Sequence, residues 1–196
     1  IEGASVNASS EWGTALNIAL YRDFKEIAEF LIKQGSDVTR ISISTFAFVV
    51  DRGSKELVEL LVELLLAHGV NVNVDLGHGR TALMIAACKS NKEMIEFLIE
   101  HGADVNIAIS EQCRVRRNWD FEYISVGTTV LMEVVQNGSL EITKLLLEHG
   151  ADVNAVNKNG WSALTYAVNG GSKELIELLI AHGADINTDC NFTTAV

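Results

Sequence analysis

The stretch "LLLEHGADVN" at residues 145–154 decides the fold, because close relatives of it return as "FLIEHGADVN" at 97–106 and "LLIAHGADIN" at 178–187. Each copy is a leucine-rich segment that ends in His-Gly and continues into a short polar tail. A glycine here is typical of a helix end, since it adopts the left-handed conformation that stops a helix. The closing glycines are spaced by 34, 33, 48 and 33 residues: Gly35, Gly69, Gly102, Gly150 and Gly183. The base period is therefore 33 residues, and one interval carries 15 more.

A second signature precedes most of these glycines by about 21 residues. It is an apolar segment that begins with Thr or Ser, whose hydroxyl can accept hydrogen bonds from free N–H groups at a helix start. Its apolar residues recur with the i, i+3, i+4 spacing of one helix face. The copies read "GTALNIAL" at 13–20, "RTALMIAA" at 80–87, "TTVLMEVV" at 128–135 and "WSALTYAV" at 161–168. The remaining unit has "STFAFVV" at 44–50, which fits the same place only with gaps.

Each period therefore predicts two helices joined by a turn. The second helix is expected to begin with a capping side chain and then a glutamate that complements the helix dipole; the caps are Ser54, Asn91, Ser139 and Ser172. One helix pair cannot bury its apolar face alone, so successive pairs must stack. The sequence predicts an all-α solenoid in a single domain over 1–196, with helix pairs at about 14–35, 44–69, 81–102, 129–150 and 162–183.

A 33-residue unit with T-A-L-x-x-A, a leucine-rich second helix and H-G-A-D-V-N resembles the ankyrin repeat. The resemblance covers essentially the whole chain, as five recognisable repeats with short finger or hairpin connections. The family's T-P-L-H pattern is altered throughout, since the chain has no proline and the histidine position holds Asn17, Ala47, Met84, Met132 and Thr165. We expect these changes to weaken local rigidity while leaving the helical pattern intact.

Three length variations interrupt the array. A short connection at 36–44 predicts a truncated finger in the second unit. The second helix of that unit carries four more residues than the fifth unit's, which predicts one added turn of about 6 Å. The third variation is an insertion within 107–124. Partial units at 1–8 and 191–196, without obvious polar caps, lead us to expect a piece of a longer array.

Composition narrows the function classes. Apolar residues make up 48% of the chain, enough for a continuous core, and no segment has the pattern of a membrane span. The net charge of −11 disfavours a nucleic acid duplex, whose phosphates would meet a repulsive field. Three widely spaced cysteines form neither a disulfide framework nor a zinc ligand pattern, so we expect a reducing, cytoplasmic compartment. We expect no metal, no cofactor and no membrane insertion.

Four histidines precede the closing glycines: His68, His101, His149 and His182. A metal or proton-relay ladder is one interpretation, and capping of helix carbonyls is the other. Stacked layers lie roughly 10 Å apart, too far for neighbouring histidines to share zinc, so we favour capping. The segment at 152–163 lacks the glycine and glutamate of a calcium loop, and no catalytic constellation appears in the spacings. No enzyme activity is expected.

The resemblance implies a non-catalytic module that binds a protein partner on the concave face formed by finger tips and first helices. Trp12 and Trp161 lie in connections, where each is either a binding anchor or a cover over the gap between fingers. Transferred position by position, the candidate contact residues are Trp12, His78, Arg80, Cys88, Lys89, Gln136, Asn137, Lys158, Asn159, Trp161 and Asn169.

The insertion concentrates cations and aromatic rings in an acidic protein. Insertions that are mere accidents of length are expected to be polar and poor in aromatics. We therefore expect a projecting loop that extends the concave face and contacts the partner or an anionic ligand. The alternative is a mobile loop whose aromatics pack on adjacent fingers. Its candidate residues are Arg114, Arg116, Arg117, Trp119, Phe121 and Tyr123.

Two other functions stay open at this point. One is a ligand-sensing ankyrin domain that binds a nucleotide or another anionic small molecule and regulates a larger enzyme or channel; the three arginines of the insertion favour it. The other is a structural spacer with no specific partner. For the leading interpretation, the acidic average charge favours a protein partner with a basic patch, mainly through a faster association rate.

Overall fold

The computed structural model describes residues 6–10, 13–52, 55–77, 79–117 and 120–187, with the backbone alone described for Ser10, Arg52, 113–117 and 120–122. The chain forms two compact units, Ile1–Gly77 (the N-terminal unit) and His78–Val196 (the C-terminal unit).

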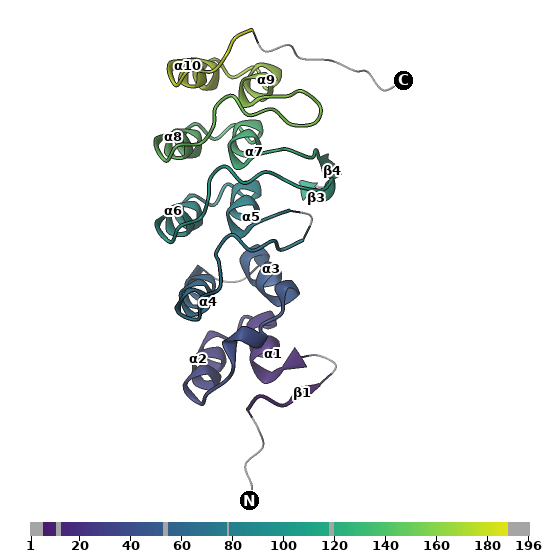
Figure 1. Cartoon of the computed structure of the whole chain (residues 1–196), viewed down its shortest axis with the longest axis vertical. Helices are drawn as coiled ribbons and strands as arrows, with labels where there is room; N and C mark the ends of the chain where they lie inside the picture. Colours follow the sequence, from purple (N-terminus) through teal and green to yellow (C-terminus); the bar gives the residue numbers. More distant parts are fainter. Residues whose placement is uncertain (1–5, 11–12, 53–54, 78, 118–119, 188–196) are drawn as a thin grey trace, which may run out of the picture. The chain divides into compact units, whose positions relative to one another are not determined.

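The N-terminal unit contains two helix pairs and a short hairpin (Figure 1). The rings of Tyr21 and Phe48, one from each helix pair, stack at a centroid distance of 4.0 Å. The side-chain amide of Asn17 donates to the carbonyl of Arg40 at 3.3 Å and accepts from the amide of Ser42 at 3.3 Å. Its elements are β1 (Ser9–Ser10), β2 (Gly13–Thr14), α1 (Ala15–Tyr21), α2 (Lys25–Lys33), the 3-10 helix η1 (Val38–Arg40), α3 (Ile43–Arg52) and α4 (Lys55–Ala67).

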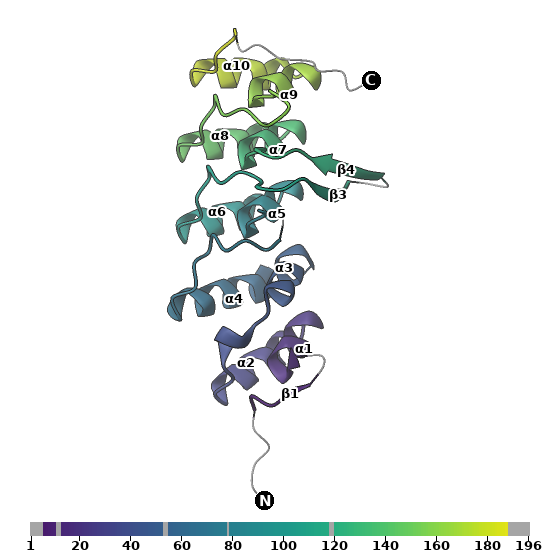
Figure 2. The same ribbon diagram turned by 45° about the vertical axis from the view of Figure 1, so that its right-hand side comes forward.

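The C-terminal unit stacks three helix pairs in two layers (Figures 1 and 2). The short helices α5, α7 and α9 form the layer beside the fingers, and α6, α8 and α10 form the outer layer. An antiparallel hairpin of β3 and β4 projects beyond the helices between α6 and α7. The bounds are α5 (Ala82–Cys88), α6 (Lys92–Glu100), β3 (Cys113–Arg117), β4 (Asp120–Ile124), α7 (Val130–Gln136), α8 (Leu140–Glu148), α9 (Ala163–Asn169) and α10 (Lys173–Ala181).

The helix starts follow the predicted capping chemistry with one exception. The first helices begin at hydroxyls that accept from the backbone three residues later: Thr14, Thr81, Thr129 and Ser162. Asn91 and Ser172 cap α6 and α10 as predicted, whereas Ser54 lies outside the described residues. The prediction for Ser139 is wrong, because its side chain makes no capping bond although it stands at the helix start. The first turn of α8 relies instead on Glu141, whose charge complements the helix dipole.

The histidine before each closing glycine caps its own helix, as predicted. Nδ1 lies 2.7–2.9 Å from the carbonyl oxygen four residues earlier in His68, His101, His149 and His182. A carbonyl oxygen can only accept, so Nδ1 carries the proton in all four rings. Each following glycine has a positive φ between 75° and 88°, the left-handed conformation that ends the helix.

The added turn in the second repeat is also confirmed. Helix α4 has 13 residues and α10 has 9. Its extra length continues the buried stripe, since Leu57, Leu61 and Leu65 are all buried. The insertion differs from the expected loop, because 113–124 pairs as a β-hairpin.

An asparagine in each of three repeat tails joins one repeat to the next. The side-chain amide of Asn106 donates to the Gly150 carbonyl at 3.0 Å, and its oxygen accepts from the Asp152 amide at 2.8 Å. Asn154 makes the same pair of bonds to Gly183 and Asp185, and Asn7 makes them to Gly35 and Asp37. The polar tail is therefore part of the interface between neighbouring repeats.

Candidate functional site

The fingers of the C-terminal unit are joined to one another through their backbones. The amide of Lys158 donates to the carbonyl of Val126 at 2.8 Å, which links the last finger to the base of the hairpin. On the other side of that base, a Cβ on Gly79 would come within 2.3 Å of the Ser110 backbone nitrogen. Only glycine fits at that position, which allows the two fingers to approach closely. Figure 2 shows the fingers along one side of α5, α7 and α9.

The finger at 156–162 is organised by Asn157, which is only 4% exposed. Its side-chain oxygen accepts from the amides of Asn159 and Trp161, both at 3.0 Å. Its side-chain nitrogen donates to the hydroxyl of Tyr166 at 3.1 Å. These bonds fix a turn that leaves Lys158 and Asn159 exposed at the tip.

The ring of Trp161 is half-buried and meets the ring of Tyr166 edge-on at a centroid distance of 4.9 Å. The contact is within one repeat, from the finger to helix α9. The indole therefore packs on the helix that follows its finger and remains partly exposed. Both interpretations of this tryptophan, anchor and cover, are compatible with that arrangement.

The ends of the three finger-side helices carry the next group of candidates. Lys89 and Asn169 are exposed, and Cys88, Gln136 and Asn137 are half-buried. The side-chain amide of Asn137 donates to the carbonyl of Ala87 in the preceding repeat at 3.1 Å. Part of its hydrogen-bonding capacity is thus used within the stack, while Lys89 and Asn169 are exposed at the ends of α5 and α9.

Arg80 lies in the finger before α5 and is half-buried. Its Nε is shielded from solvent and has no hydrogen-bond partner among the described residues. Two further tip candidates, Trp12 and His78, lie outside the described residues. The described candidates from Lys89 to Asn169 thus lie in the last finger and at the C-terminal ends of α5, α7 and α9.

The insertion is described mainly through its backbone. Strands β3 and β4 pair with Arg114 opposite Tyr123 and Arg116 opposite Phe121, and Arg117 stands opposite Asp120. Tyr123 is 62% exposed and its neighbour Ile124 is 4% exposed. The exposure of Tyr123 argues against packing of this ring on an adjacent finger, the alternative expected for the aromatics. Trp119 lies outside the described residues.

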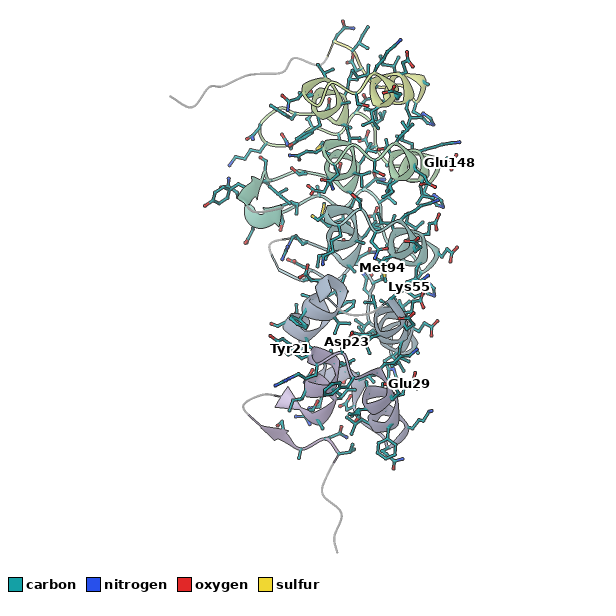
Figure 3. The ribbon with its side chains drawn as sticks, turned by 180° about the vertical axis from the view of Figure 1, so that it is seen from behind. Tyr21, Asp23, Glu29, Lys55, Met94 and Glu148 are labelled. Atoms are coloured by element: carbon teal, nitrogen blue, oxygen red, sulfur yellow. The ribbon has the colours of Figure 1, made fainter. Side chains whose placement is uncertain are left out.

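The outer layer has a different character. Ion pairs four residues apart run along each helix, such as Lys144–Glu148 at 3.8 Å on α8, with Glu148 at the outer side (Figure 3). Lys92 of α6 also donates to Glu141 of α8, and this hydrogen bond raises the pKa of Lys92. Such exposed pairs are typical of a solvated face and contribute little stability. The candidate surface is therefore on the finger side.

The sequence did not predict the positions of two buried residues, Asn157 and Glu133. Asn157 organises the last finger, and the "NKNG" turn around it was the available signal. Glu133 is fully buried at the α7 position that corresponds to Ile85 in α5. The comparison of "TTVLMEVV" with "RTALMIAA" could have revealed that a carboxylate replaces an apolar core residue there.

No helix in the described part of the chain is both long and apolar enough to cross a membrane. No group of three or more His, Cys, Asp or Glu side chains within it is arranged to hold a metal ion.

Comparison with known proteins matches residues 44–109 and 111–190 to a family described as ankyrin repeats (3 copies). A putative ankyrin repeat protein of fowlpox virus is 32% identical over 104 residues, which cover 53% of this chain and 24% of that protein. The human ankyrin repeat and SOCS box protein 6 is 36% identical over 112 residues, covering 53% of this chain and 27% of that protein. The chain thus spans about a quarter of the length of these relatives.

A solved structure of an ankyrin repeat domain from Acinetobacter baumannii aligns with a TM-score of 0.74 at 28% identity. The alignment covers 94% of this chain and 89% of that one. The predicted stack of helix pairs is therefore confirmed, with β-hairpins added at the fingers. Domains of this kind are generally protein-interaction modules and are typically non-catalytic. The chain belongs to the ankyrin repeat family.

Proposed function

We propose that the C-terminal unit binds a protein partner along its finger edge and the adjoining ends of α5, α7 and α9. The observation that carries the proposal is the finger tip fixed by Asn157. Three side-chain hydrogen bonds hold the turn, so the exposed Lys158 and Asn159 are positioned before any partner arrives. Preorganisation of this kind lowers the entropy lost on binding.

Trp161 supplies the apolar part of this surface. Tryptophan is enriched among residues that dominate binding energy, and its ring here is supported on one side by Tyr166. Exposed polar residues lie in the same finger, at Lys158 and Asn159. An apolar anchor within a polar rim is the usual composition of a protein interface.

Charge gives the partner a second property. The net charge of −11 favours a partner with a basic patch, whose approach would be accelerated by the average field. Since this effect acts on the association rate, it should weaken as salt is added. We place the interaction in the cytoplasm, the compartment that fits a chain without a disulfide framework.

A photo-crosslinking experiment tests the surface. A photoreactive amino acid is placed at Asn159 or at Asn169, and the matched control carries it at Lys144, which is exposed on α8 in the outer layer. The two test positions should capture the same protein from an extract of the source cells, identified by mass spectrometry, and Lys144 should not. Equal capture at Lys144 would place the interface elsewhere.

The captured protein then allows a quantitative test. Lys158→Ala and Trp161→Ala should each weaken its binding, and truncation of Trp161 should cost about 2 kcal/mol or more if it is a central anchor. Lys144→Ala is the control for loss of one cation. Normal affinity in both test variants would mean that the proposed surface is wrong.

The arginines of the hairpin favour a second candidate, a ligand-sensing domain for a nucleotide or another anionic small molecule that regulates a larger enzyme or channel. Three arginines lie in β3, and guanidinium groups are well suited to phosphate. A panel of nucleotides added during thermal unfolding distinguishes the candidates. A concentration-dependent rise in the melting temperature would favour the ligand sensor.

A further inference from the structure

The strand register separates the hairpin residues into two faces of different charge. Alternate residues of a strand share a face, and residues directly opposite on paired strands share it as well. Arg114 pairs with Tyr123 and Arg116 with Phe121, so these four positions form one face, which we name the arginine face. The opposite face holds the positions Cys113, Val115, Arg117, Asp120, Glu122 and Ile124.

The two faces differ in their relation to solvent at the base of the hairpin. Tyr123 belongs to the arginine face and is 62% exposed, whereas Ile124 belongs to the opposite face and is 4% exposed. The arginine face has two cations, two aromatic residues and no acid at its positions. The opposite face has one cation and two acids. In a chain with a net charge of −11, this separation produces a local patch of the opposite sign.

We propose that the arginine face binds an extended acidic peptide segment of the protein partner, with carboxylates at alternate positions. Residues two apart on a strand are separated by about 6.5–7 Å, and an extended peptide repeats its side chains at the same interval. The planar fork of arginine matches a carboxylate in a bidentate pair. Aromatic residues stand at the cross-strand positions, Tyr123 opposite Arg114 and Phe121 opposite Arg116. This inference rests on the proposed function.

The place of the hairpin in the unit supports a shared partner. Val126, two residues beyond β4, accepts the backbone hydrogen bond of Lys158, whose side chain is exposed at the neighbouring finger tip. An acidic segment that runs from the arginine face toward the helices would therefore also reach the cation of Lys158. A partner that fits the whole chain therefore has a basic patch, which is attracted to the acidic surface, and an acidic segment, which binds the arginine face. These two attractions of opposite sign fix the orientation of the partner.

A peptide fits the charge pattern better than a nucleic acid strand. A strand carries a phosphate at every nucleotide, so its charge continues past the patch into the field of the acidic body. A short acidic segment confines its charge to the length of the hairpin. The same chemistry would also attract inorganic phosphate, so the experiment includes both competitors.

The experiment uses the whole chain and two labelled peptides of equal length and charge at physiological ionic strength. One alternates glutamate with glycine at its centre, and the other spaces the same glutamates three residues apart, so that neighbouring carboxylates fall on opposite sides of an extended chain. Fluorescence anisotropy should show saturable binding with the alternating peptide preferred by about fivefold, because only its carboxylates match the arginine spacing. Arg114→Gln and Arg116→Gln should each weaken it about tenfold.

Arg117→Gln is the matched control, since it removes an identical charge from the opposite face of the same strand. It should change peptide affinity by less than about twofold, because exposed charges are screened over about 8 Å at this ionic strength. Circular dichroism of every variant confirms that the helices remain. Equal losses in all three variants, or no saturable binding of either peptide, would overturn the proposal.

Two competitors complete the test. Oligodeoxythymidylate or inorganic phosphate that bound this face more tightly than the alternating peptide would show that a strand or a free anion, and not a peptide, is its ligand. The finger surface is tested separately by Trp161→Ala and Lys158→Ala. One outcome separates the two proposals: Trp161→Ala and Lys158→Ala lose the captured partner, while Arg114→Gln and Arg116→Gln keep full affinity for it. In that case the proposed function stands and this inference fails.

Discussion

The side-chain amide of Asn106 donates to the backbone carbonyl of Gly150 at 3.0 Å, across the boundary between two repeats. The same side chain accepts from the Asp152 amide at 2.8 Å, so one asparagine satisfies a donor and an acceptor of its neighbour. Since Gly150 lies two residues after the last residue of α8, the bond couples the end of α8 to the tail of the preceding repeat. Cooperation between repeats thus has a polar component besides the apolar core.

Asn106→Ala should lower the free energy of unfolding by about 1–2 kcal/mol, because it removes two hydrogen bonds that each contribute about 1 kcal/mol. Chemical denaturation measures the change. Asn159→Ala is the control, since that exposed side chain lies at a finger tip, and it should stay within about 0.5 kcal/mol of the parent. Similar losses for the two variants would deny a special role to the tail asparagine.

The core of α7 makes a second prediction. Leu131 is 1% exposed and Leu140, at the start of α8, is 44% exposed. Leu131→Ala should destabilise the protein by about 2–5 kcal/mol through lost burial and a residual cavity. The same substitution at Leu140 should cost less than about 1 kcal/mol. Denaturant titration measures the free energy of unfolding of both variants and so compares the same Leu→Ala substitution at a buried and at an exposed position.

The finger turn makes a third prediction, about dynamics. Asn157→Ala removes the acceptor of the Asn159 and Trp161 amides, so hydrogen exchange at both amides should accelerate. Asn157→Asp keeps that acceptor and loses only the side-chain N–H bonds to the hydroxyls of Tyr166 and Thr128, so it should preserve much of the protection. Unchanged exchange in the alanine variant would mean that other contacts hold the turn.

The histidine caps make a fourth prediction. Because Nδ1 donates to a carbonyl in His68, His101, His149 and His182, the neutral rings should all be Nδ1-protonated tautomers. Nitrogen NMR distinguishes the tautomers ring by ring. An Nε2-protonated majority at any of these positions would be inconsistent with its cap.

The insertion makes a fifth prediction. Replacing 107–127 with the six residues "AVNKNG" of 155–160 should leave the helical circular dichroism intact, because Asn106 and the α7 cap Thr129 lie outside the replaced segment. Binding of the partner captured through Asn159 and Asn169 should be impaired. A shortened protein that binds normally would show that the hairpin is dispensable for recognition.

Sequence alone was sufficient where the chemistry is local. A hydroxyl such as that of Thr81 or Thr129 caps its own helix, and the histidine caps reach only four residues back, so both were predictable. The roles of Asn106 and Asn157 were not, because their partners belong to another repeat or to a folded turn. Ser139 shows the limit even of local rules, since a suitable residue in the capping position makes no capping bond.

The hairpin was visible in the sequence and was still interpreted as a loop. The segment "RVRR" followed by "DFEYI" alternates as strands do, but the two residues between them in the sequence are Asn-Trp and lack the Asn-Gly or Asp-Gly signal of a tight hairpin. Its high content of cations and aromatics suggested binding before it suggested pairing. The split of Arg114 and Arg116 from Arg117 follows only from the register.

The bridge between Ala108 and Thr129 has a consequence for how this protein family can diversify. The bridge closes the base of the insertion, one residue before the start of α7. The connection to the helices is therefore the same whatever sequence lies between Ala108 and Thr129. Each doubling of the length of a flexible loop adds only about 0.6 kcal/mol to the entropic cost of closing it. New recognition segments could therefore be acquired or exchanged here by insertion, without reselection of the helical core.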